Sequence, residues 1–456
     1  MSDSSGPREP VSASSAIVST ATASAVIMAC GVVTGLIAAR SLGPAGRGQL
    51  AAITAWATTL LWMGDFGLPD AVAYASASER RLRDRVWTTA QLLAIVFGLF
   101  VTLVGWWTFP FVFTGDNAGL VTGAQWYLAL FAVPSLGATA AFTWLQGVGR
   151  MHAFNISRAT VPVVNAVGMT LLLTAGDRSV LHFAAVLLIG NASAWLAAAA
   201  YGPVRSMGTA PPSRPLARQM LEYGARMQWG NWSNLANVRV DQLLLSIFAS
   251  PASLGLYVVG LGYANLLLTI PNTTAMAMWP GLVAACHAGD APTYLTRWYR
   301  RLLWVSLAAA VCLAAASVVV LPLLFGRAFT SAVPLAVLLV PAAVCLGMNE
   351  ILLGAFQASG RPDIASVSQV IGLTVTIAAL ATLFPRWGVY GVATASLLSY
   401  SATHLYLLRR AFDTFGVTLR SLVVPTPDDV DALRTMRAAI AHRWQTALQR
   451  PAGLNS

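Results

Sequence analysis

The chain has 456 residues, of which 57% are hydrophobic and only 10% charged, and its mean hydropathy is +0.66. This composition lies far outside the range of soluble globular proteins. The net charge is +11, and all 28 basic residues are arginine. The lack of lysine excludes a P-loop nucleotide site and a pyridoxal Schiff base, because both need the lysine amine.

Long apolar segments separated by short loops predict about twelve membrane-spanning helices, since a bilayer core of about 30 Å needs about 20 apolar residues per helix. The first six are expected at 16–39, 49–78, 86–108, 124–147, 156–176 and 180–202. The second six are expected at 222–248, 254–286, 301–325, 333–358, 364–384 and 388–408. The predicted fold is therefore an all-α, polytopic integral membrane protein.

Three polar segments flank and divide these helices. Residues 1–15 form an N-terminal tail that lacks the basic region of a signal peptide. Residues 203–221 contain several prolines and arginines and predict a linker on the membrane surface. In the tail 412–456, the sequence from Thr426 to Asp429 is typical of a helix start. Apolar residues then recur at helical spacing, which favours an interfacial amphipathic helix over a partner-binding one.

The arginines fall mainly on alternate loops. One side has only Arg40, Arg47, Arg178, Arg327 and Arg386. The other side carries Arg80, Arg81, Arg83, Arg85, Arg150, Arg158, Arg205, Arg214, Arg218, Arg297, Arg300, Arg301, Arg361, Arg409 and Arg410. By the positive-inside rule this richer side is cytoplasmic, and so are both termini. This distribution also argues against a nucleic-acid partner.

The two halves of the chain repeat each other. Pro44 and Pro251 are 207 residues apart, as are Gly48 and Gly255. The turns that end in Arg150 and Arg361 share a Gln-x-x-Gly-Arg pattern at an offset of 211. Because each half has an even number of helices, the repeats should be related by an axis along the membrane normal. The sequence thus predicts two lobes, 16–202 and 222–411.

Several of these motifs resemble a known family. They are the segment Arg40-Ser-Leu-Gly-Pro-Ala-Gly-Arg-Gly-Gln49, then Gly67-Leu-Pro69, Gln146-x-x-Gly-Arg150, Arg239-Val-Asp-Gln-Leu-Leu-Leu245 and Leu254-Gly-Leu-Tyr257. From residue 16 to about 411 the chain is similar to polysaccharide (Wzx-type) flippases of the multidrug/oligosaccharidyl-lipid/polysaccharide (MOP) exporter superfamily.

The resemblance implies two lobes around a central cavity, as in MATE and MurJ transporters. It also implies a substrate, an oligosaccharide linked to undecaprenyl diphosphate, which moves from the inner to the outer leaflet of the cell membrane. Membrane lipids are expected partners, and glycan-assembly enzymes are candidate ones. No cofactor or metal is expected, because no ligand cluster is present and the four cysteines lack CxxC spacing.

Arg239 is the main candidate for substrate binding. An ionised side chain near the bilayer centre costs about 2.5–3.5 kcal/mol, so it needs a reason. The planar guanidinium offers two parallel donors to a diphosphate, or it pairs with a carboxylate on another helix. Its neighbours Asn231 and Asn234 either line a wet cavity for sugar hydroxyls or bond between helices. Arg40 and Arg47 favour an anionic headgroup.

In the related lipid II flippases, an arginine within the first helix is implicated in holding the diphosphate. The first helix here has no arginine before Arg40 at its outer end. The carboxylates Asp65, Asp241 and Glu350 are candidates for ion coupling, because desolvation moves a carboxyl group toward titration at physiological pH. Asp70, which follows Pro69, either belongs with them or lies near the headgroups as a helix cap.

Three functions remain open at this point. The favoured one is the flipping of a lipid-linked oligosaccharide, and the runner-up is cation-coupled drug export. The third is a non-transporting scaffold for glycan assembly. An enzyme is the weaker hypothesis, because the longest outer loop, 109–123, is short for acceptor binding and no loop holds a nucleophile-base pair.

The charge asymmetry predicts the topology directly. Cysteines introduced at Arg83 and Ser213 should react with an impermeant thiol reagent only after the membrane is opened, whereas one at Asn117 should react in intact cells. Reaction of position 213 in intact cells would show that the helix count is wrong.

Overall fold

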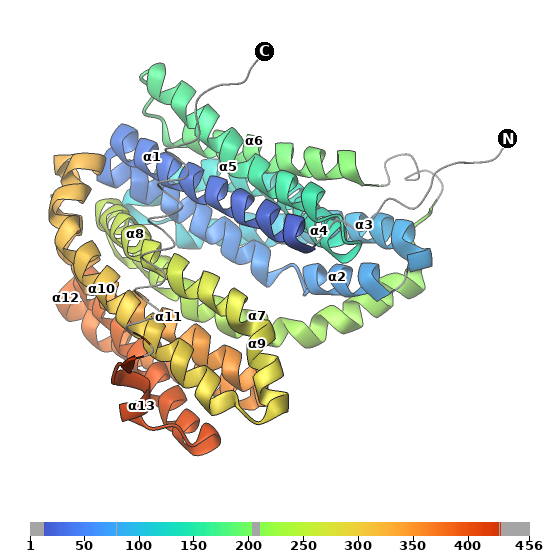
Figure 1. The fold of residues 1–456 in the computed structure, drawn as a ribbon. Helices are drawn as coiled ribbons and strands as arrows, with labels where there is room; N and C mark the ends of the chain where they lie inside the picture. Colours follow the sequence, from blue (N-terminus) through green and yellow to red (C-terminus); the bar gives the residue numbers. More distant parts are fainter. Residues whose placement is uncertain (1–12, 79, 203–209, 428, 430–456) are drawn as a thin grey trace, which may run out of the picture. The chain divides into compact units, whose positions relative to one another are not determined.

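The computed structural model describes residues 13–78, 80–202, 210–427 and 429, and every regular element in these ranges is helical. The all-α class is therefore confirmed. The helices are α1 Ala13–Met63, α2 Leu68–Ser78, α3 Arg83–Val112, α4 Val121–Gly147, α5 Met151–Thr174, α6 Val180–Tyr201, α7 Arg214–Phe248, α8 Pro251–Ala264, α9 Thr269–Ala288, α10 Ala291–Phe325, α11 Val333–Ala358, α12 Pro362–Phe415 and α13 Leu419–Val423 (Figure 1).

Nine helical segments of the described chain are long and apolar enough to cross a membrane. Two of them, Thr22–Met63 and Pro362–Phe415, contain a sharp break and therefore hold two spans each. α7 has 35 residues and is long enough, but it is not one of the nine because its polar side chains lower its mean hydropathy. With both breaks and α7 included, the described residues contain twelve segments of membrane length, as the sequence predicts.

Two expected loops are single-residue breaks instead. The loop between 39 and 49 is helical in the structure and is interrupted only at Gly43, where φ is 67°. The gap between 384 and 388 is likewise a break at Gly388, where φ is 52°. A glycine adopts positive φ without a steric cost, and a nearby proline removes a backbone donor, so the chain turns within one residue. The sequence located both interruptions and overestimated their length.

The expected helix 49–78 is divided in the structure. α1 ends at Met63 and α2 begins at Leu68, and the intervening turn contains Phe66 and Gly67 at positive φ. The expected outer loop 109–123 is also mostly helical, because α3 continues to Val112 and a 3₁₀ helix covers Gly115–Leu120. Asn117 in that helix is only 4% exposed, so the neighbouring exposed residue Asp116 is the better position for the outside label.

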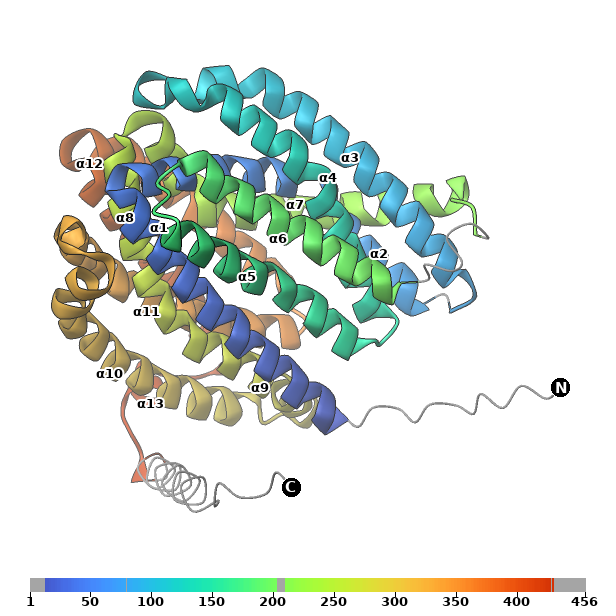
Figure 2. The ribbon, with the colours of Figure 1, turned by 90° about the horizontal axis from the view of Figure 1, so that it is seen from above.

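Contacts group the described residues into two compact units. The first comprises the residues up to Gly262 with Ser317–Ala336 and Ile377–Ala393. Within it α3 packs along α4, and α5 packs against both α1 and α6 (Figure 2). The second comprises Tyr263–Ala316, Val337–Thr376 and the described residues from Thr394 onward. The division into the lobes 16–202 and 222–411 stays a prediction about the internal repeat.

Within the first unit, α1 and α8 cross with their backbones in direct contact. A Cβ atom at Gly48 would lie 1.7 Å from the carbonyl oxygen of Pro251 and 2.9 Å from the amide nitrogen of Gly255. A Cβ atom at Gly255 would lie 1.9 Å from the carbonyl oxygen of Pro44 and 3.0 Å from the amide nitrogen of Gly48. In the sequence, Pro44 matches Pro251 and Gly48 matches Gly255 at an offset of 207. In the structure, Gly48 contacts Pro251 and Gly255 contacts Pro44, so equivalent positions of the two halves make equivalent contacts.

Parts of two predicted segments lie outside the described residues. Most of the amphipathic helix expected after Thr426 is among them, as are residues 203–209 of the linker 203–221. The start of the tail helix is described, and its Thr426 and Asp429 are bonded reciprocally. The Asp429 carboxylate accepts from the backbone N–H of Thr426 at 3.0 Å, and the Asp429 N–H donates to the Thr426 carbonyl at 3.0 Å.

The close crossing of α1 and α8 makes a stability prediction. Gly48→Ala should force the helices apart and destabilise the protein by about 1–3 kcal/mol, the usual cost of overpacking. Gly35→Ala is the matched control, because Gly35 lies in the same helix and a Cβ there meets nothing within 4 Å. Thermal unfolding in detergent measures both. Equal melting temperatures would contradict the contact.

Candidate functional site

Arg239 lies in the last third of α7, which begins at Arg214 with Pro215 in its first turn and runs as one helix to Phe248. Its side chain is half-buried, and Nη1 donates to Oε1 of Gln242, one turn further along, at 3.3 Å. Among the described residues the guanidinium has no carboxylate within ion-pair distance. Most of its donors are therefore available for an anion. Its contact with substrate stays a prediction.

Asp241, two residues beyond Arg239, points to a different partner. Its carboxylate accepts a short hydrogen bond from the hydroxyl of Tyr257 on α8. Asp241 is 6% exposed and Tyr257 is fully buried, so this pair joins α7 to α8 away from lipid. A buried carboxyl group without such a donor would cost several kcal/mol. The role of Asp241 in ion coupling stays a prediction.

The turn between α1 and α2 brings together a second group of polar side chains. Asp65 Oδ1 accepts from the backbone N–H of Gly67 at 3.0 Å, and its carboxyl group also contacts the amide of Gln228 on α7. Gln228 is 4% exposed, and its Nε2 donates to the carbonyl of Trp62 at 3.0 Å. Trp232 Nε1 donates to the carbonyl of Met63 at 3.2 Å. Two side chains of α7 thus bind the carbonyl groups at the end of α1.

This turn is strained and tightly enclosed. Phe66 has a φ of 48°, which is unusual for a residue with a side chain, and its ring packs 5.1 Å from that of Phe97. A Cβ atom at Gly67 would lie 2.3 Å from the carbonyl oxygen of Gly224, so α7 approaches the turn backbone to backbone. Strain of this kind costs about 1–3 kcal/mol and is concentrated at functional and switching sites.

The two outer arginines have different surroundings. Arg40 donates through Nε to the carbonyl of Leu324 at 2.5 Å and through Nη2 to that of Leu323 at 2.7 Å. It therefore caps the C-terminal turn of α10, where a cation also suits the helix dipole. The Nε atom of Arg47 is buried and has no hydrogen-bond partner among the described residues. Contact of either residue with substrate stays a prediction.

The remaining candidates lie elsewhere. Positions 231 and 234 belong to α7, but the side chains of Asn231 and Asn234 lie outside the part of the chain that the structure describes. Glu350 on α11 is in the second unit and has an exposed side chain. The described residues contain no group of three or more histidine, cysteine, aspartate or glutamate side chains that could hold a metal ion.

Beside Glu350, the structure reveals a polar network that sequence reasoning missed. His404 on α12 bonds through Nδ1 to Asn349 Oδ1 at 2.8 Å and through Nε2 to the hydroxyl of Tyr299 at 2.9 Å. Asn349 also donates through Nδ2 to the carbonyl of Tyr400 at 3.2 Å. In the sequence, this network is indicated only by single polar residues, such as His404 and Asn349, within apolar segments. Such a residue does not show which helices contribute its hydrogen-bond partners.

A family model described as "polysaccharide biosynthesis protein" matches residues 14–284, which is more than half of the chain. The chain belongs to this family. The predicted resemblance to Wzx-type flippases of the MOP superfamily is thereby confirmed. A search of curated proteins found no significant match.

Solved structures agree with this assignment at the level of the fold. An inward-facing multidrug resistance MATE family transporter of the MOP superfamily superposes with a TM-score of 0.70 at 15% identity, over 86% of this chain and 96% of that one. The lipid II flippase MurJ, in an inward closed conformation, gives 0.70 at 12% identity, over 89% and 91%. A MOP superfamily transporter from Pyrococcus furiosus gives 0.53 at 14% identity, over 88% and 96%. The chain is therefore a multi-pass membrane protein with the MATE and MurJ fold.

The pair of Asp241 and Tyr257 makes a second stability prediction. Tyr257→Phe should destabilise the protein by about 1–3 kcal/mol, because it leaves Oδ2 of the buried Asp241 without its hydroxyl donor, while Oδ1 keeps the backbone N–H of Gln242. If the two groups interact directly, the double variant Asp241→Asn/Tyr257→Phe should lose less stability than the sum of the single variants. Thermal unfolding in detergent gives all four values. Strict additivity would show that the hydroxyl and the carboxylate do not interact.

Proposed function

We propose that this protein is a flippase that carries an oligosaccharide linked to a polyprenyl diphosphate from the inner to the outer leaflet by alternating access. The observation that carries the proposal is its membership of the polysaccharide biosynthesis family. The charge of Arg239, which has no carboxylate within ion-pair distance among the described residues, adds support from the site. Transport of this kind needs no catalytic residue, and we propose no enzymatic activity.

In this proposal Arg239 holds the diphosphate. Its guanidinium presents parallel N–H donors that match two phosphate oxygens, and the interaction gains strength in a cavity of low dielectric constant. The positions 231 and 234 lie on the same helix and would face the first sugars. The polyprenyl tail is as apolar as the lipid around it, so it stays in the bilayer while the headgroup crosses.

The turn between α1 and α2 is the proposed moving part. Its strained backbone and its hydrogen bonds to α7 hold one arrangement, and transporters commonly place such broken helices where a substrate or an ion binds. Asp65 in this turn, Asp241 in α7 and Glu350 in α11 are the proposed coupling sites. Protonation would remove the charge of a carboxylate and so alter its hydrogen bonds.

The location of the protein follows from the same proposal. Both termini would lie in the cytoplasm, in agreement with the arginine distribution, and the substrate would be of the undecaprenyl diphosphate type. The enzymes that build the glycan on the inner leaflet would supply it, which makes them candidate partners.

Deletion of the gene distinguishes the competing functions. Loss of a flippase should cause lipid-linked glycan to accumulate on the cytoplasmic face without a change in sensitivity to cationic dyes. Dye hypersensitivity with normal surface glycan would instead identify a drug exporter. Loss of glycan synthesis without accumulation of the lipid-linked form would favour the scaffold.

Substitution of Arg239 tests the site itself. Arg239→Ala should lower complementation of surface glycan at least about tenfold, whereas Arg239→Lys should retain part of it, because lysine keeps the charge and loses the planar fork. Arg218→Ala is the control on the same helix, since Arg218 is exposed and pairs with Glu222 on the surface. All three proteins must be present in the membrane at equal levels. Full activity of Arg239→Ala would remove Arg239 from the site.

A further inference from the structure

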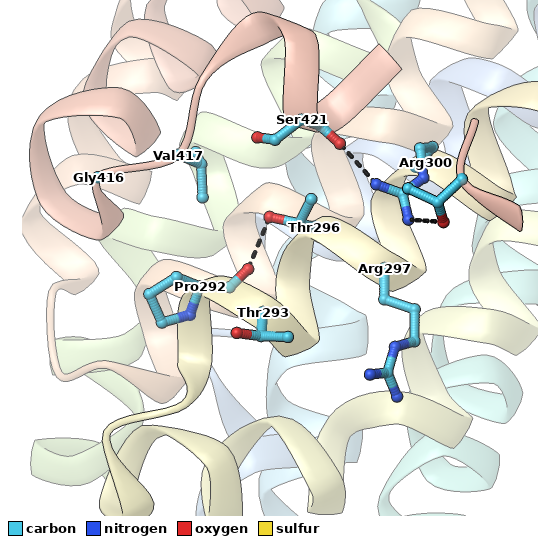
Figure 3. Close-up of a pocket in the computed structure, with 9 residues that line it drawn as sticks. Pro292, Thr293, Thr296, Arg297, Arg300, Gly416, Val417 and Ser421 are labelled. Atoms are coloured by element: carbon cyan, nitrogen blue, oxygen red, sulfur yellow. Dashed lines mark hydrogen bonds between the residues drawn. The ribbon is translucent and has the colours of Figure 1, made fainter. Parts of the chain in front are cut away.

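The second unit contains a cavity of about 380 Å³ that includes none of the candidate site residues described above. It lies between the first turns of α10 and the segment that follows α12 (Figure 3). The lining is formed by Pro292, Thr293, Thr296, Arg297, Arg300, Gly416, Val417, Ser421 and Thr426. This segment of α10 belongs to the side that the arginine distribution assigns to the cytoplasm.

Three arginines follow one another along this part of α10. Arg300 and Arg301 follow Arg297 by three and four residues. In Figure 3 the Arg297 side chain is directed away from Ser421, to which Arg300 is bonded. Asp429 joins two of them, because its carboxylate accepts from Arg300 Nε in a short hydrogen bond and from Arg301 Nε at 2.9 Å. Arg300 also donates to the Ser421 carbonyl at 2.8 Å and to the Thr426 hydroxyl at 3.0 Å.

The ion pair of Arg300 with Asp429 is buried beside the cavity. Burial on its own would raise the pKa of Asp429, but the hydrogen bonds from Arg300, Thr426 and Arg301 outweigh it and hold that pKa below its usual range. A carboxyl group with a lowered pKa stabilises the folded state above its ordinary pKa, and the effect is lost only as the pH falls through the lowered value. The carboxylate therefore stays ionised near neutral pH, and Arg300 has few donors left for a ligand.

Arg297 is different. Its side chain is exposed, and no described residue forms a hydrogen bond or ion pair with its guanidinium. Among the described residues around the cavity, Arg300 and Arg301 share one carboxylate and Arg297 has none, so these groups together carry a net positive charge. The hydroxyl of Thr293, which is also exposed, lies in the same lining and adds a hydrogen-bonding group. These groups match a phosphate, which accepts hydrogen bonds and carries negative charge.

Exposed apolar side chains beside the cavity favour a lipid headgroup as the source of this phosphate. Leu419 and Val424 are 57% and 48% exposed, and Trp304 is 44% exposed while its Nε1 donates to the carbonyl of Val423 at 2.8 Å. Exposed leucine, valine and tryptophan next to arginine are typical of a segment at the membrane interface. The cavity thus lies at the level of the lipid headgroups.

We propose that this cavity binds the phosphate of an anionic phospholipid of the cytoplasmic leaflet, with Arg297 as its main ligand. The lipid headgroup would lie beside Thr293 and Arg297, on the α10 side of the cavity. Ser421 and Thr426, which bond to Arg300 of α10, would form the opposite wall. This inference does not depend on the substrate that the protein transports.

Lipid retention by the full-length protein tests the proposal. Wild-type protein purified in detergent should bind phosphatidylglycerol in native mass spectrometry in preference to phosphatidylcholine. Arg297→Gln should bind phosphatidylglycerol about fivefold more weakly, the effect of one basic residue near a membrane surface. Arg81→Gln is the control, because Arg81 is an exposed arginine of the same predicted side and does not line the cavity. Equal binding by wild type and Arg297→Gln would overturn the proposal.

A second measurement separates a lipid headgroup from free phosphate. In zwitterionic lipid, addition of inorganic phosphate should leave the thermal stability of the protein unchanged. Phosphatidylglycerol should raise the melting temperature of the wild type more than that of Arg297→Gln. A rise with inorganic phosphate that requires Arg297 would show that the site binds a soluble anion instead. Equal melting temperatures of the two proteins without added ligand confirm that the variant folds.

Discussion

Inside a bilayer no water is available for a backbone carbonyl, so each helix that stops there needs donors from the protein itself. This constraint explains the most specific polar contacts of the first unit. Gln228 binds the Trp62 carbonyl, and Trp232 binds that of Met63, where α1 ends. At another helix end, Arg40 binds the last carbonyls of α10. A helix can be broken and still be stable only because a neighbouring helix carries the matching side chain, and this links the broken helix to α7.

The internal repeat becomes a physical contact in the structure. Pro44 and Gly48 lie against Pro251 and Gly255, and the two glycines allow the backbones of α1 and α8 to touch. Positions that are equivalent in a pseudo-symmetric protein meet where the symmetry axis passes between them, so the contact supports the predicted relation between the halves. Glycine-mediated approach is also how membrane helices gain packing energy without a hydrophobic driving force.

The fold could be predicted from two local features of the sequence, the length of its apolar segments and the positions of its glycines and prolines. Apolar runs of about 20 residues fix the length of each span, and the Gly-Pro signals near Gly43 and Pro385 mark where the chain changes direction. The sequence could not show that each turn takes a single residue. The hydrogen-bond partners of the buried polar groups could not be predicted either. Asp241 pairs with Tyr257 of the next helix, and His404 bonds to Tyr299 of α10 and to Asn349 of α11. Such pairings depend on helix rotation and packing, which hydropathy does not encode.

The central claim, transport of a diphosphate-linked glycan between leaflets, is tested most directly in proteoliposomes. The purified protein is reconstituted with a polyprenyl-diphosphate-linked saccharide, and a membrane-impermeant glycosidase then reports which leaflet holds the sugar. The account predicts that the protected fraction becomes accessible when wild-type protein is present and stays protected with Arg239→Ala. Accessibility that is the same in vesicles with and without the protein would contradict the account.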